Sequence, residues 1–190
     1  MTKQNIAIVT VVLAILIDQI SKIYVKTHFT LGEEVVVFAD WFKIHFTENN
    51  GMAWGVELGG RAGKLFLTLF RLFAVSGIIY WLIQNIKKNT HIGVIIAISL
   101  ILAGAIGNII DSVFYGVIFD SSHGQVATLF AENPYGELFY GKVVDMLYFP
   151  MYRGESFTFF NAIFNGADSW ISIGVVLLFI FNKQAFPKEG

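Results

Sequence analysis

The sequence has no cysteine and few charged side chains, and both absences exclude large classes of protein. Without cysteine there can be no disulfide scaffold, Cys-ligated zinc site, iron–sulfur cluster or thiol nucleophile. Charged residues make up 14% of the 190 residues, against about 25% in a typical soluble domain. The net charge is −1 and there is no basic block, so nucleic-acid-binding, collagenous and disordered proteins are excluded as well. A composition that is 55% apolar instead indicates an integral membrane protein.

Long apolar stretches predict the fold class, which is a membrane all-α protein with minor β structure. A helix needs about 20 mostly apolar residues to cross the roughly 30 Å hydrocarbon layer. Four stretches qualify, at about residues 6–24, 65–83, 92–118 and 161–181. We therefore expect one integral membrane domain over residues 1–190, built as a four-transmembrane-helix bundle with outer loops at about 27–63 and 119–160.

Lysines near the ends of these stretches predict the orientation. With four crossings, one side of the membrane receives all five of the flanking lysines, Lys3, Lys87, Lys88, Lys183 and Lys188. Short loops rich in Lys and Arg stay in the cytoplasm. Both termini are therefore expected to be cytoplasmic, with the two long loops outside.

The first outer loop predicts a small β hairpin on the outer membrane face. Residues 34–38 (EVVVF) are followed by a break and then by residues 41–47 (WFKIHFT), in which apolar and polar side chains alternate. This alternation has the period of a strand. Asn49-Asn50-Gly51 is typical of a tight turn. The second outer loop has turn residues at 133–136 and no clear repeat.

Polar side chains within the apolar stretches mark a candidate site, because such groups are costly in hydrocarbon. At about 1.5 Å per residue, Asp18 lies roughly 18 Å from the inner start of the first stretch. Asn108 and Asp111 lie about 24 and 28 Å along the third stretch, near its outer end. Asp168 lies one or two turns below the outer start of the fourth. Groups from three spans thus converge at one depth, just under the outer surface.

Two of these groupings also have a purely structural interpretation. Asp18 and Lys22 are spaced as an i, i+4 ion pair that could brace the helix ends. Asn108 and Asp111 share one face of their helix, and the small residues Ala103 and Gly107 would allow a neighbouring helix to approach closely. Structural and chemical roles both stay open for these residues.

Asp168 has no basic residue in its own span, so it must be protonated, hydrogen-bonded or facing another polar group. Asp145 lies in an apolar run of the second outer loop and could meet the start of the fourth span. Two adjacent carboxyl groups cannot both ionise cheaply, so one keeps a proton while the other can act as a base. Such a pair can activate water toward a carbonyl without a metal.

Other chemistries find little support in the sequence. It has no G-x-S-x-G, H-E-x-x-H or phosphate-binding loop motif, and its four histidines show no ligand spacing. We therefore expect no metal and no cofactor. A small proton- or ion-coupled transporter is the alternative, because membrane acids also serve as relays. Against it, the fourth stretch has no ionisable side chain from Ser169 to Phe181.

Five short motifs, in one order along the chain, resemble those of the lipoprotein signal peptidase family, bacterial signal peptidase II. They are residues 18–22 (DQISK), 49–55 (NNGMAWG), 104–111 (GAIGNIID), 143–145 (VVD) and 164–168 (FNGAD). Each motif alone is weak. Together, at matching membrane depths, they are specific.

The resemblance implies an aspartic endopeptidase of the bacterial cytoplasmic (inner) membrane, with its active site near the outer face. Its substrates would be prolipoproteins with a diacylglyceryl-modified cysteine, cut just before that cysteine. Asp145 and Asp168 would be the catalytic dyad. The residues that would bind substrate or support the site are Asp18, Lys22, Asn49, Gly51, Asn108, Asp111 and Asn165. The expected partners are the substrate, membrane lipid and the cyclic peptide inhibitor globomycin, and four spans could hold the site in a monomer.

The chain departs from the family pattern in two places. The family usually has Arg directly after the third-span Asp, where this chain has Ser112. Arg71, about 9 Å into the second span, could instead supply a positive group near a lipid phosphate. The stretch from Tyr115 to Lys142 is also longer than usual. Its residues 126–130 could rest on the membrane as part of a lid, or the stretch could be a tolerated insertion.

Overall fold

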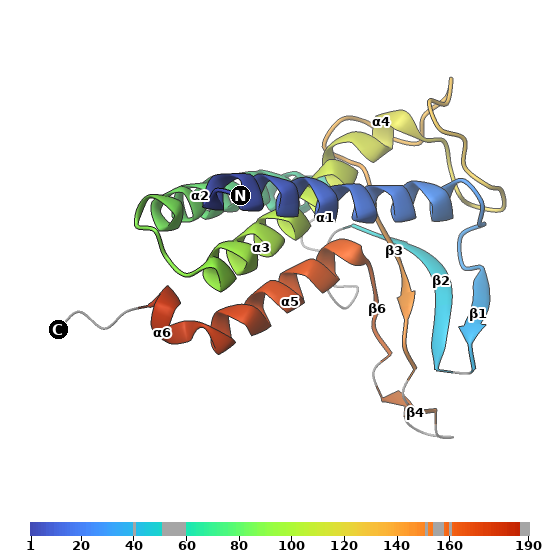
Figure 1. The fold of residues 1–190 in the computed structure, drawn as a ribbon. Coiled ribbons are helices and arrows are strands. Elements are labelled where there is room, and N and C mark those ends of the chain that lie inside the picture. The colour runs from blue at the N-terminus through green and yellow to red at the C-terminus, as the bar shows by residue number, and fades with distance from the viewer. Residues whose placement is uncertain (40, 51–59, 151, 154–157, 160, 187–190) are drawn as a thin grey trace. The chain divides into compact units, whose positions relative to one another are not determined.

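The computed structural model describes the chain apart from residues 40, 51–59, 151, 154–157, 160 and 187–190, and it is mostly helical (Figure 1). The helices are α1 (Lys3–Lys26), α2 (Gly60–Lys87), α3 (Ile92–Ile110), α4 (Gly116–Ile118), α5 (Gly166–Ile180) and α6 (Asn182–Ala185). A π-helical segment, Asp111–Tyr115, joins α3 to α4. Within the described residues, three helical stretches are long and apolar enough to cross a membrane, namely Lys3–Lys26, Gly60–Lys87 and Ile92–Ile118.

The chain forms two compact units. Unit 1 contains Met1–Gln19, Leu69–Ile109 and Gly166–Gly190. Unit 2 contains Ile20–Thr68 and Ile110–Asn165. Unit 1 is helical, whereas unit 2 combines the remaining parts of the helices with the strands.

In unit 1, α3 forms the centre of the core. Val94, Ile95 and Ile98 are fully buried against Ala7 of α1 and Leu82 of α2. Twelve of the 19 residues of α3 are buried, so the burial of its apolar side chains contributes much of the free energy that stabilises this core.

Glycines allow α5 to pack closely on α3. A Cβ atom on Gly174 would lie 2.6 Å from the carbonyl oxygen of Ala97, and one on Gly104 would clash with the carbonyl oxygen of Ala167. The small residues of these helices therefore set the distance between them, as they do between membrane helices generally.

The outward faces of α1 and α2 carry large apolar side chains. Leu13 and Ile17 on α1, and Phe70 and Phe73 on α2, are each more than half exposed. Apolar surface on this scale is unfavourable in water and suits the hydrocarbon of a bilayer.

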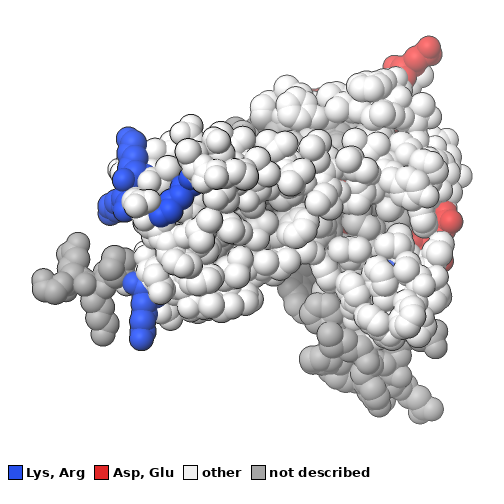
Figure 2. Space-filling view, in the orientation of Figure 1, with Lys and Arg blue, Asp and Glu red and all other residues white. Residues whose placement is uncertain are grey.

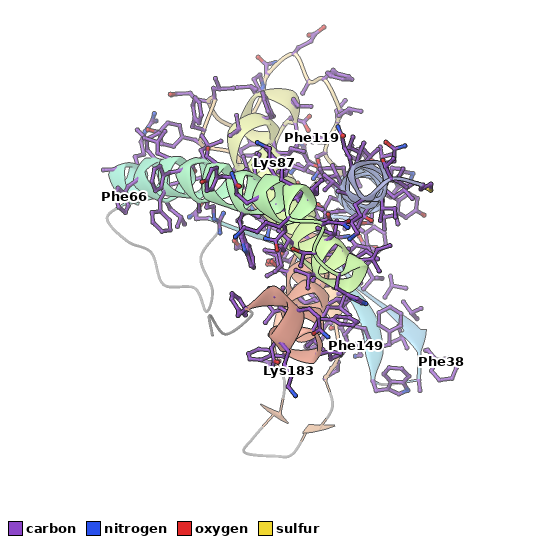
Figure 3. All side chains as sticks on the ribbon, turned by 60° about the vertical axis from the view of Figure 1, so that its left-hand side comes forward. Phe38, Phe66, Lys87, Phe119, Phe149 and Lys183 are labelled. Atoms are coloured by element: carbon purple, nitrogen blue, oxygen red, sulfur yellow. The ribbon has the colours of Figure 1, made fainter. Side chains whose placement is uncertain are left out.

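Unit 2 contains an antiparallel sheet with the strand order β1-β2-β3-β6. Its strands are β1 (Glu34–Phe38), β2 (Phe42–Asn49), β3 (Val143–Tyr148) and β6 (Ile163–Phe164). A separate pair is formed by β4 (Tyr152–Arg153) and β5 (Thr158–Phe159). The predicted hairpin is confirmed, and Phe38 marks the end of β1 at its turn (Figure 3).

Two sequence-based expectations need correction. The fourth apolar stretch, placed at residues 161–181, becomes helical only at Gly166, because Ile163 and Phe164 pair as β6 with β3. Strand β3 lies where only an irregular outer loop was expected. Five of its six residues are buried, so the apolar run lacks the alternation by which a half-buried strand is recognised.

Candidate active site

Asp168 lies in the first turn of α5, in unit 1, and is half-buried. Its Oδ1 atom accepts a hydrogen bond of 2.9 Å from the side-chain amide of Asn108 on α3. The predicted approach of the third and fourth apolar stretches is therefore confirmed by a direct contact.

Asp18 of α1 caps the start of α5. Its Oδ1 atom accepts a hydrogen bond of 2.7 Å from the backbone N–H of Ala167. The first N–H groups of a helix have no partner within the helix, and the helix dipole favours a negative charge there. Asp18 therefore fixes the turn that contains Asp168.

Gly107 provides the space that Asp18 needs. A Cβ atom at Gly107 would lie 2.5 Å from Asp18 Oδ2. The neighbouring Gln19 donates from its side-chain amide both to Asp18 Oδ2, at 3.1 Å, and to the Gly107 carbonyl oxygen, at 3.2 Å. The close approach predicted for the small residues of α3 is thus observed, and a buried carboxylate occupies it.

The other end of unit 1 is basic. Lys3 Nζ donates to the carbonyl oxygens of Asn89 and Thr90, both at 2.6 Å, so the start of α1 lies beside the turn between α2 and α3. Phe181, after α5, stacks on His91 at 4.8 Å between ring centroids. A group of blue side chains covers this end in Figure 2. Asp18 lies about 22 Å further along α1 than Lys3, so the polar site and the basic end are at opposite ends of unit 1.

Asp145 lies on β3 in unit 2 and is buried. Its Oδ2 atom accepts a hydrogen bond from the side-chain amide of Asn49, at the end of β2. Its Oδ1 atom accepts a second, of 2.6 Å, from the side-chain amide of Asn165. Two amide groups thus fix both carboxyl oxygens of Asp145.

A buried ion pair supports the neighbouring backbone. Lys22 Nζ lies 2.7 Å from Asp111 Oδ2, and both side chains are fully buried. The same Asp111 oxygen accepts a hydrogen bond of 3.3 Å from the backbone N–H of Val144, which precedes Asp145. Asp111 thereby ties the start of the π-helical segment to β3.

The structure places almost every predicted site residue in one of two groups. Unit 1 brings together Asp18, Asn108 and Asp168; unit 2 brings together Lys22, Asn49, Asp111, Asp145 and Asn165. Gly51 lies outside the described residues. Arg71 on α2 is half-buried and Ser112 is buried, and the suggested contact of Arg71 with lipid stays a prediction.

Sequence reasoning missed Lys26 and Glu48 of unit 2, whose charged side chains are buried. They form an ion pair with each other. One signal was available for each of them. Lys26 follows Lys22 by one helical turn, and Glu48 directly precedes Asn49.

Comparisons with known proteins agree on one family. Residues 10–183 match the family described as Signal peptidase (SPase) II. A lipoprotein signal peptidase of Porphyromonas gingivalis is 50% identical over 183 residues, covering 90% of this chain and 79% of the relative. One of Amoebophilus asiaticus is 36% identical over 195 residues, covering 93% of this chain and 77% of the relative.

A solved structure, described as a bacterial membrane enzyme determined by the in meso method, has a similar fold. The two chains are 26% identical with a TM-score of 0.65, and the match covers 98% of this chain and 95% of the other. The similarity thus extends over nearly the whole chain.

Proposed function

Since the chain belongs to the signal peptidase II family, we propose that Asp145 and Asp168 form its catalytic dyad. The chain is an aspartic peptidase of a multi-pass membrane type that removes signal peptides from prolipoproteins. The two relatives reported above are both named lipoprotein signal peptidases, which favours the peptidase over the transporter alternative. The identity of the dyad, the position of the cut and the membrane orientation are the parts that we add as proposals.

One observation carries the assignment of the dyad. Asn165 donates to Asp145 at 2.6 Å and precedes Asp168 by three residues. Consecutive Cα atoms are about 3.8 Å apart, so the chain holds the Cα atoms of Asn165 and Asp168 within about 11 Å. This short connection supports a pairing of the two carboxyl groups.

In the proposed mechanism, the two carboxyl groups share one proton. Two close carboxylates cannot both ionise cheaply, so one stays protonated. The ionised member would take a proton from a water molecule that attacks the scissile carbonyl, while its protonated partner donates to the carbonyl oxygen and gives a gem-diol intermediate. When the C–N bond breaks, the first member would pass the proton from water to the leaving amine, and its partner would take a proton back from a diol hydroxyl as the new carboxyl group forms. Asn108, Asn49 and Asn165 would hold the carboxyl groups in the required orientation.

The two ends of unit 1 indicate the orientation of the chain in the membrane and the depth of the proposed site. We propose that the basic end faces the cytoplasm, since lysines and arginines favour that side. Together α1, α2, α3 and α5 would then make four crossings, with both termini inside and the polar site just below the outer face. A cysteine that carries diacylglycerol stays in the bilayer and would present the preceding peptide bond at that depth in the bacterial cytoplasmic membrane.

Arg71 keeps its proposed role beside a lipid phosphate, because Ser112 supplies no charge. We expect Arg71→Ala to weaken substrate affinity or turnover in liposomes that contain anionic lipid. The matched control is Lys87→Ala, which removes a cation from the other end of α2. Unchanged affinity and turnover in Arg71→Ala would refute this role.

A cleavage assay with the purified full chain tests the dyad. The substrate is a diacylglyceryl-modified prolipoprotein, and globomycin is added in a parallel reaction. Asp145→Asn and Asp168→Asn should each lower turnover by at least about 10²- to 10⁴-fold, whereas wild-type cleavage should be blocked by globomycin. Asp120→Asn is the control, because the Asp120 carboxylate accepts a hydrogen bond from the backbone N–H of Thr128 in the loop after α4 and belongs to neither group of predicted site residues. Wild-type turnover by either folded dyad variant would refute the assignment.

A further inference from the structure

Unit 2 contains a buried charged cluster that none of the predicted site residues belongs to. At its centre is Glu48 of β2, whose Oε1 atom accepts hydrogen bonds from Lys26 Nζ and, at 3.0 Å, from Ser122 Oγ. Lys26 also donates to Ser122 Oγ at 2.9 Å, and Lys142 Nζ lies 3.5 Å from Glu48 Oε2. We call Lys26, Glu48, Ser122 and Lys142 the Glu48 cluster.

The environment of the cluster keeps Glu48 charged inside the protein. The Glu48 side chain is 3% exposed. Burial by itself raises its pKa, but the nearby ammonium groups of Lys26 and Lys142 and the Ser122 hydroxyl hold the pKa below its usual value. The Lys26 ammonium also lies over the rings of Phe119 (Figure 3) and Tyr135, at 5.2 and 5.0 Å from their centroids. Buried ion pairs add little net stability, so their best-attested use is to specify one arrangement of the chain.

The cluster and Asp145 lie on opposite faces of the sheet. Glu48 pairs with Val144 across β2 and β3, whereas Asp145 pairs with Thr47. Since successive side chains of a strand point to opposite faces, Asn49 shares the face of Thr47 and Asp145. The Glu48 side chain is therefore held on one face of the sheet, while Asn49 donates to Asp145 on the other face.

The end of β2 needs such an anchor. Its pairing with β3 shifts between Ile44 and Thr47, so Thr47 to Asn49 form a separate short run of pairs. On its other side, the pairing with β1 ends at His45, and among the described residues Phe46 adds backbone hydrogen bonds with Glu33 and Gly32, so the backbone bonds on this side stop before Thr47. A strand end with few hydrogen bonds opens readily, and movement there would displace Asn49.

We infer that the Glu48 cluster positions Asn49 against Asp145, and that the loop after α4 takes part in this by supplying Ser122 and Lys142. The inference rests on the proposed dyad and extends it. Lys26, Glu48, Ser122 and Lys142 are positioning residues, because they act on the carboxyl group only through Asn49.

The loop after α4 makes backbone and side-chain contacts with the rest of unit 2, as a positioning role requires. The backbone N–H of Leu31 donates to the Ser122 carbonyl oxygen at 3.1 Å. Isolated bridges join Thr30 to Val126 and Phe119 to Leu129, and Ala127 is buried in the unit 2 core. The long stretch before Lys142 is thus packed against the sheet, which a freely tolerated insertion would not require.

A double-mutant cycle tests the inference in the full chain, with the diacylglyceryl-modified prolipoprotein as substrate. The variants are Glu48→Gln, Asn49→Ala and their combination. The control is Glu34→Gln, which removes a Glu–Lys ion pair of 2.5 Å with Lys43 from the same sheet, away from Asn49. Thermal unfolding in detergent identifies the folded variants, and Ser122→Ala replaces Glu48→Gln if the latter does not fold.

We expect Glu48→Gln to lower kcat by about tenfold to a hundredfold, which is typical of a misplaced catalytic group, with KM changed by less than about twofold. In the Asn49→Ala background, the same change should lower kcat no further, because both act through one hydrogen bond. Glu34→Gln should keep wild-type kcat.

Two results would overturn the inference alone. One is wild-type kcat in Glu48→Gln while Asp145→Asn is inactive. The other is a double mutant in which the kcat losses of Glu48→Gln and Asn49→Ala multiply fully. That result would mean that Glu48→Gln damages the structure independently of Asn49. Retained cleavage by Asp145→Asn would instead overturn the dyad, and the inference with it.

Discussion

The two carboxyl groups of the proposed dyad are held by different means in the two units. Asp168 depends on helix geometry: Asn108 donates to it, and Asp18 caps the turn that contains it. Asp145 lies on a short strand whose surroundings contain two buried ion pairs, Lys22–Asp111 and Lys26–Glu48. A helix satisfies its own backbone and needs only a cap, whereas a short strand draws its position from its neighbours. Both of these buried ion pairs therefore lie in unit 2.

The largest effect should come from breaking the ion pair next to Asp145. Lys22→Met leaves the buried Asp111 carboxylate without its cation, which should lower the free energy of unfolding by about 3–5 kcal/mol. Denaturant-induced unfolding in detergent measures the change. Lys43→Met provides the comparison, because its partner Glu34 is partly exposed. An equal effect of both substitutions would remove the distinction between the fully buried pair and the partly exposed pair.

The amide donors to the two carboxyl groups form a matched pair with a smaller expected effect. A hydrogen bond to a charged group is worth about 1.5–3 kcal/mol, so Asn165→Ala and Asn108→Ala should each lower kcat by about tenfold to a hundredfold. The loss should be greater in Asn165→Ala, because Asp145 is buried while Asp168 is half-buried and can bind water instead. Steady-state kinetics on both variants decides this, and the reverse order would contradict the account of Asp145 as the more enclosed carboxyl group.

The smallest expected effect is a loss of stability at acidic pH. The pKa of Glu48 is below its usual value of 4.5, so its contribution to stability is present above that value and is lost as the pH falls through the folded-state pKa. Wild-type protein should therefore lose more stability than Glu48→Gln between pH 7 and pH values below about 4. Unfolding midpoints across this range test the sign. Parallel pH curves for the two proteins would show that Glu48 does not titrate with folding.

The sequence predicted the helical part of the site well, for a physical reason. A polar residue in a long apolar stretch is conspicuous, and a fixed rise per residue converts its number into a depth. Asp18, Asn108 and Asp168 were placed together in this way, and their contacts confirm it. The contacts of α1 and α3 with the start of α5 could therefore be predicted without any knowledge of the loops.

The part of the site in unit 2 was less predictable. Strand β3 is buried on both faces, so it has no alternation to reveal it. Lys22 forms an ion pair with Asp111, which belongs to a distant stretch of the chain, and no pattern in the sequence indicated this partner. Lys26 and Glu48 are 22 residues apart, and only the folded chain shows that they meet.

The absence of cysteine allows the most direct test of the central claim, which is that Asp145 and Asp168 meet. Asp145→Cys/Asp168→Cys would contain the only two thiols in the chain, and dibromobimane becomes fluorescent when it bridges two neighbouring thiols. Asp145→Cys/Ser172→Cys is the control, because Ser172 lies one turn further along α5. We predict strong bridging in the first variant and weak bridging in the control. Absence of bridging in a folded first variant, with both thiols reactive toward a monofunctional maleimide, would contradict the dyad.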